Sequence, residues 1–248
     1  MTENHSFESS QSGSFNPLQN DNRRYDRSGH DGNSAQNNRN YQNHGGHDGD
    51  SGQNNRNYQN RGGRKPFMPW RQPDRWSDYS FLGKVIPEAR IISFKTPLKA
   101  RYFAKDTPQF GITELLDEVK LLGGELGLVV DLTYTTKYYE PTDLTDRGVE
   151  YKKIFCPGRD FGGLEKLGAE FIGIVKEYLE RNGNNQKWVG VHCTHGLNRT
   201  GYLVCRYLHE ALGWPMDEAI EKFETARGHE IEREEYLLEL RKLNLNAE

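Results

Sequence analysis

The feature that most limits how this chain can fold is the scarcity of apolar side chains in its first 65 residues. This stretch is built mainly of Asn, Gly, Gln, Ser, His, Asp and Arg, and residues 30–43 return almost unchanged as residues 47–60, a period of 17. Ordering a backbone costs about 1–2 kcal/mol per residue, and so little apolar area cannot offset that cost. We therefore predict a disordered tail over residues 1–65.

Two roles for this tail remain open. Tyr41, Tyr58 and the Arg-Gly-Gly-Arg run at residues 61–64 are typical of an arm that binds RNA or associates with itself. A solubilising extension without any ligand would have the same composition. The low mean hydropathy of the whole chain, −0.92, is consistent with either role, because both leave part of the chain unfolded.

Residues 66–248 have the pattern of one folded domain, in which strand-like and helix-like segments alternate. Short apolar runs predict strands over residues 90–94, 126–132, 149–155 and 187–191. Helical spacing or position predicts helices over residues 112–122, 164–179, 199–212, 215–226 and 231–243. This alternation predicts an α/β domain with a central mixed sheet flanked by helices.

Charge, hydropathy and cysteine spacing exclude several classes of protein. The predicted domain carries 25 basic and 29 acidic residues, so any contact with nucleic acid is expected to be local. The chain has no apolar run near the roughly 18 residues of a membrane span and no secretory leader, so we expect no membrane contact. Three cysteines at spacings that suit neither disulfides nor zinc indicate a reducing, intracellular setting. We expect no metal and no cofactor, and a monomer.

The segment Val-His-Cys-Thr-His-Gly-Leu-Asn-Arg-Thr-Gly, residues 191–201, lies between a predicted strand and a predicted helix. The start of a helix presents unpaired backbone N–H groups and the positive end of the helix dipole, which together bind anions. Arg199 adds a planar guanidinium that suits two phosphate oxygens, and Gly196 permits a strained turn. The segment therefore predicts a phosphate-binding loop.

Cys193 stands at the start of this loop, where the same N–H groups favour a thiolate. Its pKa should fall below the roughly 8.5 of a free cysteine, which makes it a nucleophile at neutral pH. Thr200 is expected to hydrogen-bond the sulfur and help it leave when a phosphoenzyme is hydrolysed. We expect His192 to order the loop. The alternative for a cysteine, a small buried apolar residue, is our interpretation of Cys156 and Cys205.

Cys193 and Arg199, with five residues between them, form the signature of cysteine-dependent phosphatases. The longer string resembles the RNA 5′-phosphatase branch of the dual-specificity family, which includes the triphosphatase domain of animal mRNA capping enzymes and stand-alone enzymes. The likeness extends over residues 70–243, and residues 129–139 and 226–233 resemble the stand-alone members. The resemblance implies an enzyme that removes the γ and β phosphates of RNA 5′ ends through a phosphocysteine and leaves a 5′-monophosphate. It also implies contact with ribonucleoprotein and a nuclear location, with the cytoplasm possible as well.

A 5′-triphosphate brings more negative charge than Arg199 alone would balance, so further contacts to the substrate are expected. We predict that they come from the rest of the loop, Thr194, His195, Gly196, Leu197 and Asn198, and from four outer cations, Lys137, Arg159, Arg227 and Arg233. Each outer cation also has a simpler interpretation as a solvated surface charge.

Phosphatases of the resembled family use an aspartic acid about thirty residues before the cysteine to protonate the leaving oxygen. Asp160 lies 33 residues upstream of Cys193, although its surroundings differ from the usual Trp-Pro-Asp pattern. Asp131, at the end of a predicted strand, is the second candidate. Either carboxylate is also explained as an ordinary loop or strand-end residue, and the choice stays open.

Two other functions also remain open. The loop chemistry is shared with protein phosphatases that act on phosphotyrosine or phosphothreonine. A non-catalytic scaffold that binds RNA through its tail would also hold phosphate in this loop, although such a protein has no need of a thiolate.

Overall fold

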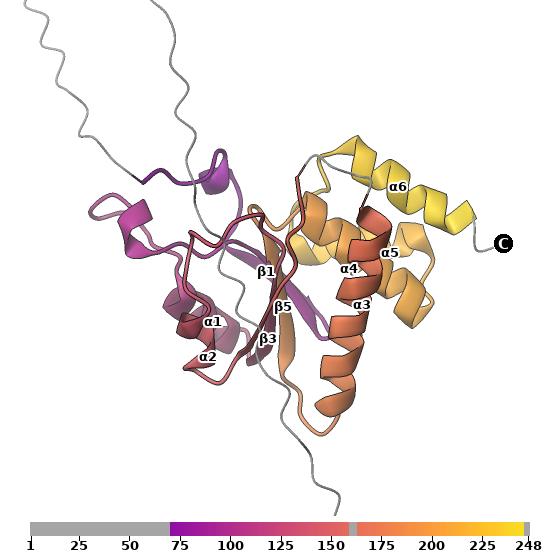
Figure 1. The fold of residues 1–248 in the computed structure, drawn as a ribbon, viewed down its shortest axis with the longest axis horizontal. Helices are drawn as coiled ribbons and strands as arrows, with labels where there is room; N and C mark the ends of the chain where they lie inside the picture. The colour runs from indigo at the N-terminus through magenta and orange to yellow at the C-terminus, as the bar shows by residue number, and fades with distance from the viewer. Residues whose placement is uncertain (1–69, 159–162, 246–248) are drawn as a thin grey trace, which may run out of the picture. The chain divides into compact units, whose positions relative to one another are not determined.

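The computed structural model describes residues 70–158 and 163–245. The predicted tail and its boundary at residue 65, together with Arg159 and Asp160, lie outside these residues. Figure 1 shows the described part as a sheet with helices on both of its faces. The predicted α/β class, with a central mixed sheet flanked by helices, is confirmed.

The sheet has five strands in the order β1-β2-β5-β3-β4. Their bounds are Leu82–Ile86 for β1, Ile91–Lys95 for β2, Leu126–Asp131 for β3, Glu150–Lys153 for β4 and Trp188–Cys193 for β5. β1 pairs antiparallel with β2, and the other pairs are parallel. The three central strands are almost wholly buried because helices cover both faces, which explains their nearly continuous apolar runs.

The helices divide between the two faces of the sheet (Figure 1). One face carries α1 (Ile112–Leu121) and the short α2 (Thr142–Thr145). The other face carries α3 (Leu164–Arg181), α4 (Asn198–Leu212), α5 (Met216–Arg227) and α6 (Glu234–Leu245). Each face has its own apolar cluster, with Phe94 and Val129 of the sheet in one and Val130 and Val191 in the other. Because successive side chains along a strand point to opposite faces of the sheet, each of these strands contributes to both apolar clusters.

The order of the strands fixes where a ligand can bind. The chain passes from β2 to β3 and β4 and then returns to insert β5 between β2 and β3. In a parallel sheet, the crevice at the carboxyl ends of the strands opens where the connections diverge to the two sides. The carboxyl end of β5 is Cys193, so the topology places the predicted loop at this position.

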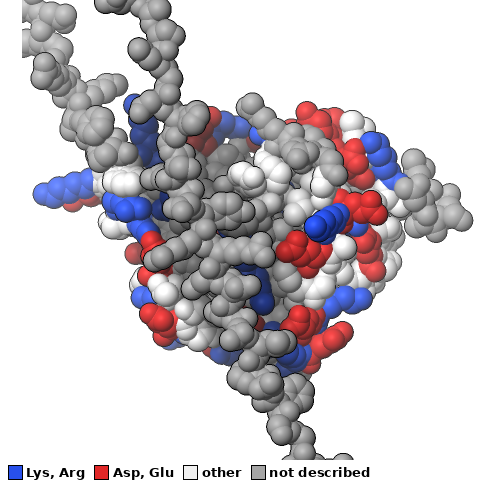
Figure 2. Space-filling view, in the orientation of Figure 1, with Lys and Arg blue, Asp and Glu red and all other residues white. Residues whose placement is uncertain are grey.

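The surface of the domain agrees with its near balance of charge. Figure 2 shows acidic and basic side chains interspersed over the visible part of one face. In the part of the chain that the structure describes, no helix combines the length and apolarity needed to cross a membrane. The same residues contain no cluster of three or more metal-ligating side chains.

Candidate active site

The loop between β5 and α4 is fixed by a close approach to β2. Gly196 has φ of +71°, and a Cβ atom at this position would lie 2.2 Å from the carbonyl oxygen of Phe94. Any other residue would therefore be both strained and in collision with backbone. Thr96 N–H donates to the carbonyl of Thr194 at 3.1 Å, which ties the loop to the end of β2. Helix α4 begins at Asn198, so its amino end faces the loop.

Cys193 is buried at the base of this loop. Burial by itself raises the pKa of the thiol. The charge of Arg199, the hydroxyl of Thr200 and the backbone N–H groups of Thr200 and His195 lower the pKa by more than burial raises it. The net result is a pKa below the ordinary value, which favours the thiolate. The Thr200 hydroxyl is itself buried and has no other hydrogen-bond partner among the described residues, so its hydrogen is available to the sulfur.

Arg199 is held in place by three acceptors. Its Nη1 donates to the carbonyls of Leu132 at 3.0 Å and Cys156 at 2.8 Å, and its Nη2 donates to Thr194 Oγ1 at 3.0 Å. No group in the described part of the chain accepts the Nε hydrogen. The guanidinium is therefore oriented by backbone that follows β3 and β4 and keeps a donor for a phosphate oxygen.

The prediction that Arg227 contacts substrate is corrected by the structure. Its side chain is buried, with 1% of its surface exposed, and the guanidinium donates to the carbonyls of Gly196 at 3.2 Å and His195 at 3.0 Å. It also donates to the hydroxyl and carbonyl of Ser80. Burial lowers its pKa to about 10. Arg227 therefore shapes the loop from behind and does not face a ligand.

Asn198 and Arg233 also hold backbone. Asn198 Oδ1 accepts the backbone N–H of Arg233 at 2.9 Å, and the guanidinium of Arg233 donates to the carbonyl of Gly158. Lys137 differs because it is exposed, and its Nζ lies 5.3 Å from the centre of the Tyr138 ring. Of the described outer cations, Lys137 keeps the most freedom to reach a ligand. Leu197 is fully buried and supports the loop by packing.

His195 lies at the side of the loop against the segment that precedes β1. Its Nε2 donates to the backbone carbonyl of Asp74 at 2.7 Å, and its ring centre is 5.0 Å from that of Tyr79. Burial lowers the pKa of His195, so the ring is neutral near pH 7. The structure thus gives His195 a role in attaching residues 74–79 to the loop.

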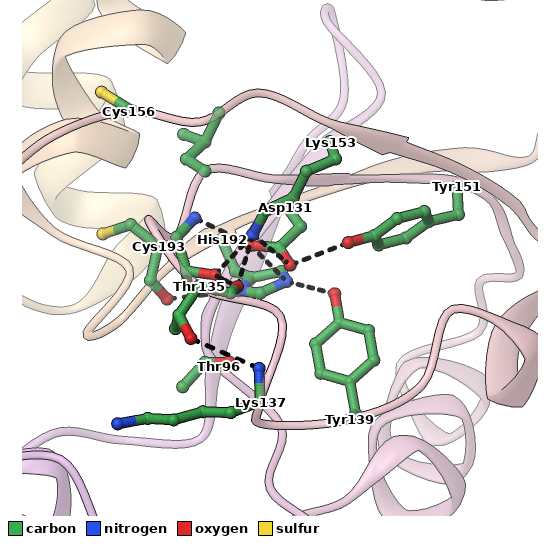
Figure 3. Close-up of polar contacts among 12 residues, drawn as sticks. Thr96, Asp131, Thr135, Lys137, Tyr139, Tyr151, Lys153, Cys156, His192 and Cys193 are labelled. Atoms are coloured by element: carbon green, nitrogen blue, oxygen red, sulfur yellow. Dashed lines mark hydrogen bonds and ion pairs between the residues drawn. The ribbon is translucent and has the colours of Figure 1, made fainter. Parts of the chain in front are cut away.

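Asp131 is poorly suited to act as the general acid, because its buried carboxylate is already paired with a cation and two further donors. It is 3% exposed and accepts from Lys153 Nζ at 2.9 Å, Tyr151 O–H at 3.0 Å and Thr133 N–H at 2.8 Å (Figure 3). Burial raises the pKa of Asp131, but the ammonium of Lys153 at 2.9 Å and the donated backbone N–H of Thr133 act against burial, and the pKa lies below the ordinary value. These contacts argue against Asp131 as the acid, and the assignment of Asp160 stays a prediction.

His192 joins this network to the nucleophile. Its Nδ1 lies 3.2 Å from the carbonyl of Cys193, which can only accept, so Nδ1 carries the proton. Its Nε2 then accepts the O–H of Tyr139 at 2.7 Å (Figure 3). Burial lowers the pKa of His192 and raises that of Tyr139, so both are neutral at pH 7. These contacts agree with our expectation that His192 orders the loop.

The thiols of the other two cysteines are not activated as nucleophiles. Burial raises the pKa of Cys156 to about 11 and that of Cys205 well above its ordinary value. Both thiols are free and buried. Their surroundings agree with the interpretation of these residues as small apolar side chains.

Lys95 is a residue of the site that the sequence analysis missed. It is buried at the end of β2, and its Nζ donates to the carbonyls of Trp76 at 2.9 Å and Tyr79 at 2.7 Å. Burial lowers its pKa to about 8. A single lysine at the end of an apolar strand was the available signal, because such a lysine must find acceptors. Lys95, His195 and Arg227 together fasten residues 74–80 to the loop.

The family described as "Dual specificity phosphatase, catalytic domain" matches residues 115–245. The chain belongs to this family. Its membership of the RNA-related branch of the cysteine phosphatases, which the loop string predicted, is supported by the relatives as well.

Two relatives and one solved structure show the range of the likeness. The "RNA/RNP complex-1-interacting phosphatase homolog" of Caenorhabditis elegans is 45% identical over 67% of this chain and 73% of that protein. The "Tyrosine-protein phosphatase" of Autographa californica nuclear polyhedrosis virus is 45% identical over 68% of this chain and 98% of that protein. The chain spans about half the length of the mammalian relatives that it matches. The crystal structure of a mutant form of Tk-PTP shares the fold, with TM-score 0.51 and 23% identity over 66% of this chain and 95% of that one.

Proposed function

We propose that this phosphatase removes the γ and then the β phosphate from the 5′ end of RNA. The observation that carries the proposal is a buried thiol of lowered pKa at the amino end of α4, next to an oriented guanidinium, with no protonated carboxyl at Asp131. The names of several relatives, which interact with an RNA or ribonucleoprotein complex, support the same substrate class and suggest such complexes as partners.

The chemistry takes two steps at each phosphate. The Cys193 thiolate attacks the γ phosphorus, an S–P bond forms, and the bond from the γ phosphorus to the bridging oxygen breaks, so RNA diphosphate leaves. Water then attacks the same phosphorus and releases inorganic phosphate, and the electron pair of the S–P bond returns to sulfur. The Thr200 hydroxyl stabilises the thiolate as it re-forms. Arg199 and the loop amides bind the phosphoryl oxygens throughout.

The nature of the leaving group makes this substrate depend little on a general acid. A tyrosine phenol has a pKa near 10, whereas a terminal phosphate has its second pKa near 6. A diphosphate therefore leaves without first gaining a proton. Phosphotyrosine has a greater need for an acid, and since Asp131 is held as a paired carboxylate, that reaction would depend on Asp160.

Asp160 gives a direct check of this argument. We expect Asp160→Ala to lower kcat for 5′-triphosphate RNA by less than about tenfold, because proton transfer contributes little to a good leaving group. Cys193→Ser should abolish turnover. The measurement is steady-state phosphate release from RNA by both variants. Equal losses in the two variants would remove the leaving-group argument.

Hydrolysis of phosphotyrosine is the second candidate function, favoured by the name of the viral relative. The test gives the full chain RNA labelled at the γ and β phosphates and a phosphotyrosine peptide in parallel, in the absence of metal. We expect kcat/KM to be higher for RNA and the final product to be 5′-monophosphate RNA. A clear preference for the peptide would contradict the proposal, and no phosphate release from either substrate would favour a binding scaffold.

A further inference from the structure

Two exposed aromatic rings stand beside the site and have no role in the chemistry above. Tyr134 is 66% exposed and Phe155 is 53% exposed, and their ring centres are 6.2 Å apart with the planes at 86°. Exposing large rings on a water-facing surface forgoes the hydrophobic gain of burying them, so adjacent exposed rings commonly mark a contact surface. We call Tyr134 and Phe155 the aromatic pair.

The aromatic pair is carried by the two segments whose backbone holds the phosphate-binding guanidinium. Tyr134 follows Leu132 by two residues, and Phe155 directly precedes Cys156. The carbonyls of Leu132 and Cys156 are the two backbone acceptors of Arg199 Nη1, at 3.0 and 2.8 Å. Both rings therefore start from backbone within two residues of an atom that touches the guanidinium. The segments that carry the pair follow β3 and β4, and each supplies one of these two acceptors.

The backbone that carries Tyr134 is held firmly on both sides. Lys153 Nζ donates to Thr133 Oγ1 at 2.7 Å and to the carbonyl of Thr135 at 2.8 Å (Figure 3). Thr133 N–H donates to Asp131 at 2.8 Å. The buried network around Asp131 thus positions the turn that presents Tyr134. A backbone that is already fixed reduces the conformational freedom lost when a ligand stacks on the ring it carries.

A cation also lies close to the pair. Lys153 Nζ is 5.1 Å from the centre of the Phe155 ring. A flat, electron-rich ligand that carries phosphate at one end would stack on the rings while its phosphates reach Arg199 and the loop. A nucleobase has a π-face whatever its identity, so stacking would hold the first nucleotide without selecting its sequence.

From these contacts, and resting on the proposed function, we infer that Tyr134 and Phe155 form a stacking site for the first base of a 5′-phosphorylated RNA. The other large apolar side chains that the described residues expose are Trp70, Leu121, Leu122, Leu212 and Leu238. None of these residues adjoins a backbone acceptor of Arg199 in the described structure. The aromatic pair therefore determines a preference for RNA ends over phosphate chains that lack a base.

The test compares substrates with the same phosphates and different attachments. The full chain, Tyr134→Ala, Phe155→Ala and the double variant are assayed with 5′-triphosphate RNA, inorganic tripolyphosphate and a phosphotyrosine peptide. Removing an aromatic ring on which a base stacks weakens binding of that base, so the ratio of kcat/KM for RNA to that for tripolyphosphate should fall roughly tenfold or more in the double variant. Leu121→Ala, which removes an 81% exposed side chain on α1, is the matched control and should leave the ratio unchanged.

Binding separates this inference from the proposed function. RNA with 2-aminopurine as its first base is titrated into Cys193→Ser with and without the aromatic pair. Quenching of the 2-aminopurine fluorescence that disappears in the double variant supports stacking, even if the active protein fails to hydrolyse RNA. Unchanged quenching, equal losses on RNA and tripolyphosphate, or a loss confined to the peptide would each overturn the inference.

Discussion

Thr200 shows how a single buried hydroxyl can serve chemistry because it has no other partner. Leaving a buried polar group without a hydrogen bond costs about 1–3 kcal/mol, so such groups are rare unless they have a use. The hydroxyl has no other described partner, and its position lowers the pKa of Cys193. Its cost to stability is offset when the sulfur is charged. The Thr200 hydroxyl therefore stabilises the thiolate form of Cys193 more than its thiol form.

Replacing Thr200 by valine tests this interpretation. Thr200→Val keeps the shape and removes the donor, so the pKa of Cys193 should rise and the phosphoenzyme should break down roughly tenfold more slowly, as expected for losing a hydrogen bond to a charged group. The pH dependence of iodoacetamide alkylation measures the pKa, and single-turnover kinetics measure breakdown. Thr113→Val on the exposed side of α1 is the control. An unchanged alkylation midpoint would contradict the assigned role.

At the scale of elements, the loop depends on the short segment that precedes β1. Residues 74–80 are attached by Lys95 at the end of β2, by His195 in the loop and by Arg227 at the end of α5. The matched family region begins only at residue 115, so residues 74–80 lie outside it. Three parts of the chain that are distant in sequence thus hold residues 74–80 in place and together determine the shape of the loop.

Lys95 makes the attachment of residues 74–80 sensitive to pH. Burial lowers its pKa from 10.5 to about 8 in the folded protein, so between these two values the unfolded chain binds more protons than the folded chain. The free energy of unfolding contributed by Lys95 therefore rises as pH increases from 8 to 10.5 and is constant below 8. In Lys95→Met, that part of the rise should be missing. Urea unfolding at pH 7.5, 9 and 10 measures the difference, with Lys120→Met on exposed α1 as the control, and parallel profiles for Lys95→Met and the unmodified protein would contradict this assignment.

For the whole molecule, the balance of charge limits how RNA is held. The 25 basic and 29 acidic residues beyond residue 65 leave no excess of positive charge, and both signs mix on the visible face (Figure 2). Binding energy must then come from the phosphates at the loop and from contacts beside it. A long polyanion-binding surface would require a segregated basic face, as in proteins that follow a nucleic-acid backbone.

This balance predicts weak dependence on RNA length and salt. For Cys193→Ser, we expect 5′-triphosphate RNA to bind much more tightly than the same RNA with a 5′-hydroxyl. A slope of log K against log salt no steeper than about −2 is expected, because each neutralised phosphate of a single strand contributes about −0.7. Fluorescence anisotropy over a range of salt concentrations measures both. Equal binding of the two RNAs with a steep slope would show that the backbone is the main ligand.

Secondary structure was largely predictable because the signals are local. The helices predicted over residues 112–122 and 164–179 are α1 and α3, and the apolar run 126–132 is β3, each within two residues at either end. The edge strand β1 was missed because it is half-buried and contains Gly83. A Cβ there would lie 2.4 Å from the carbonyl of Ala226. The glycine is therefore required by the close approach of α5, which lies far along the chain.

The sequence alone determined the phosphate-binding loop of this protein. Cys193, Arg199 and Thr200 lie within eight consecutive residues, and the geometry of a strand followed by a helix brings them together whatever surrounds them. Only the tertiary structure decided which charges face the ligand and which hold the loop. Arg227 and Asp131 carry the residue types of a substrate contact and an acid, yet both are buried against partners. Burial and pairing decide the protonation state of a charged side chain and the groups that it can contact. Both depend on segments that are far apart in sequence.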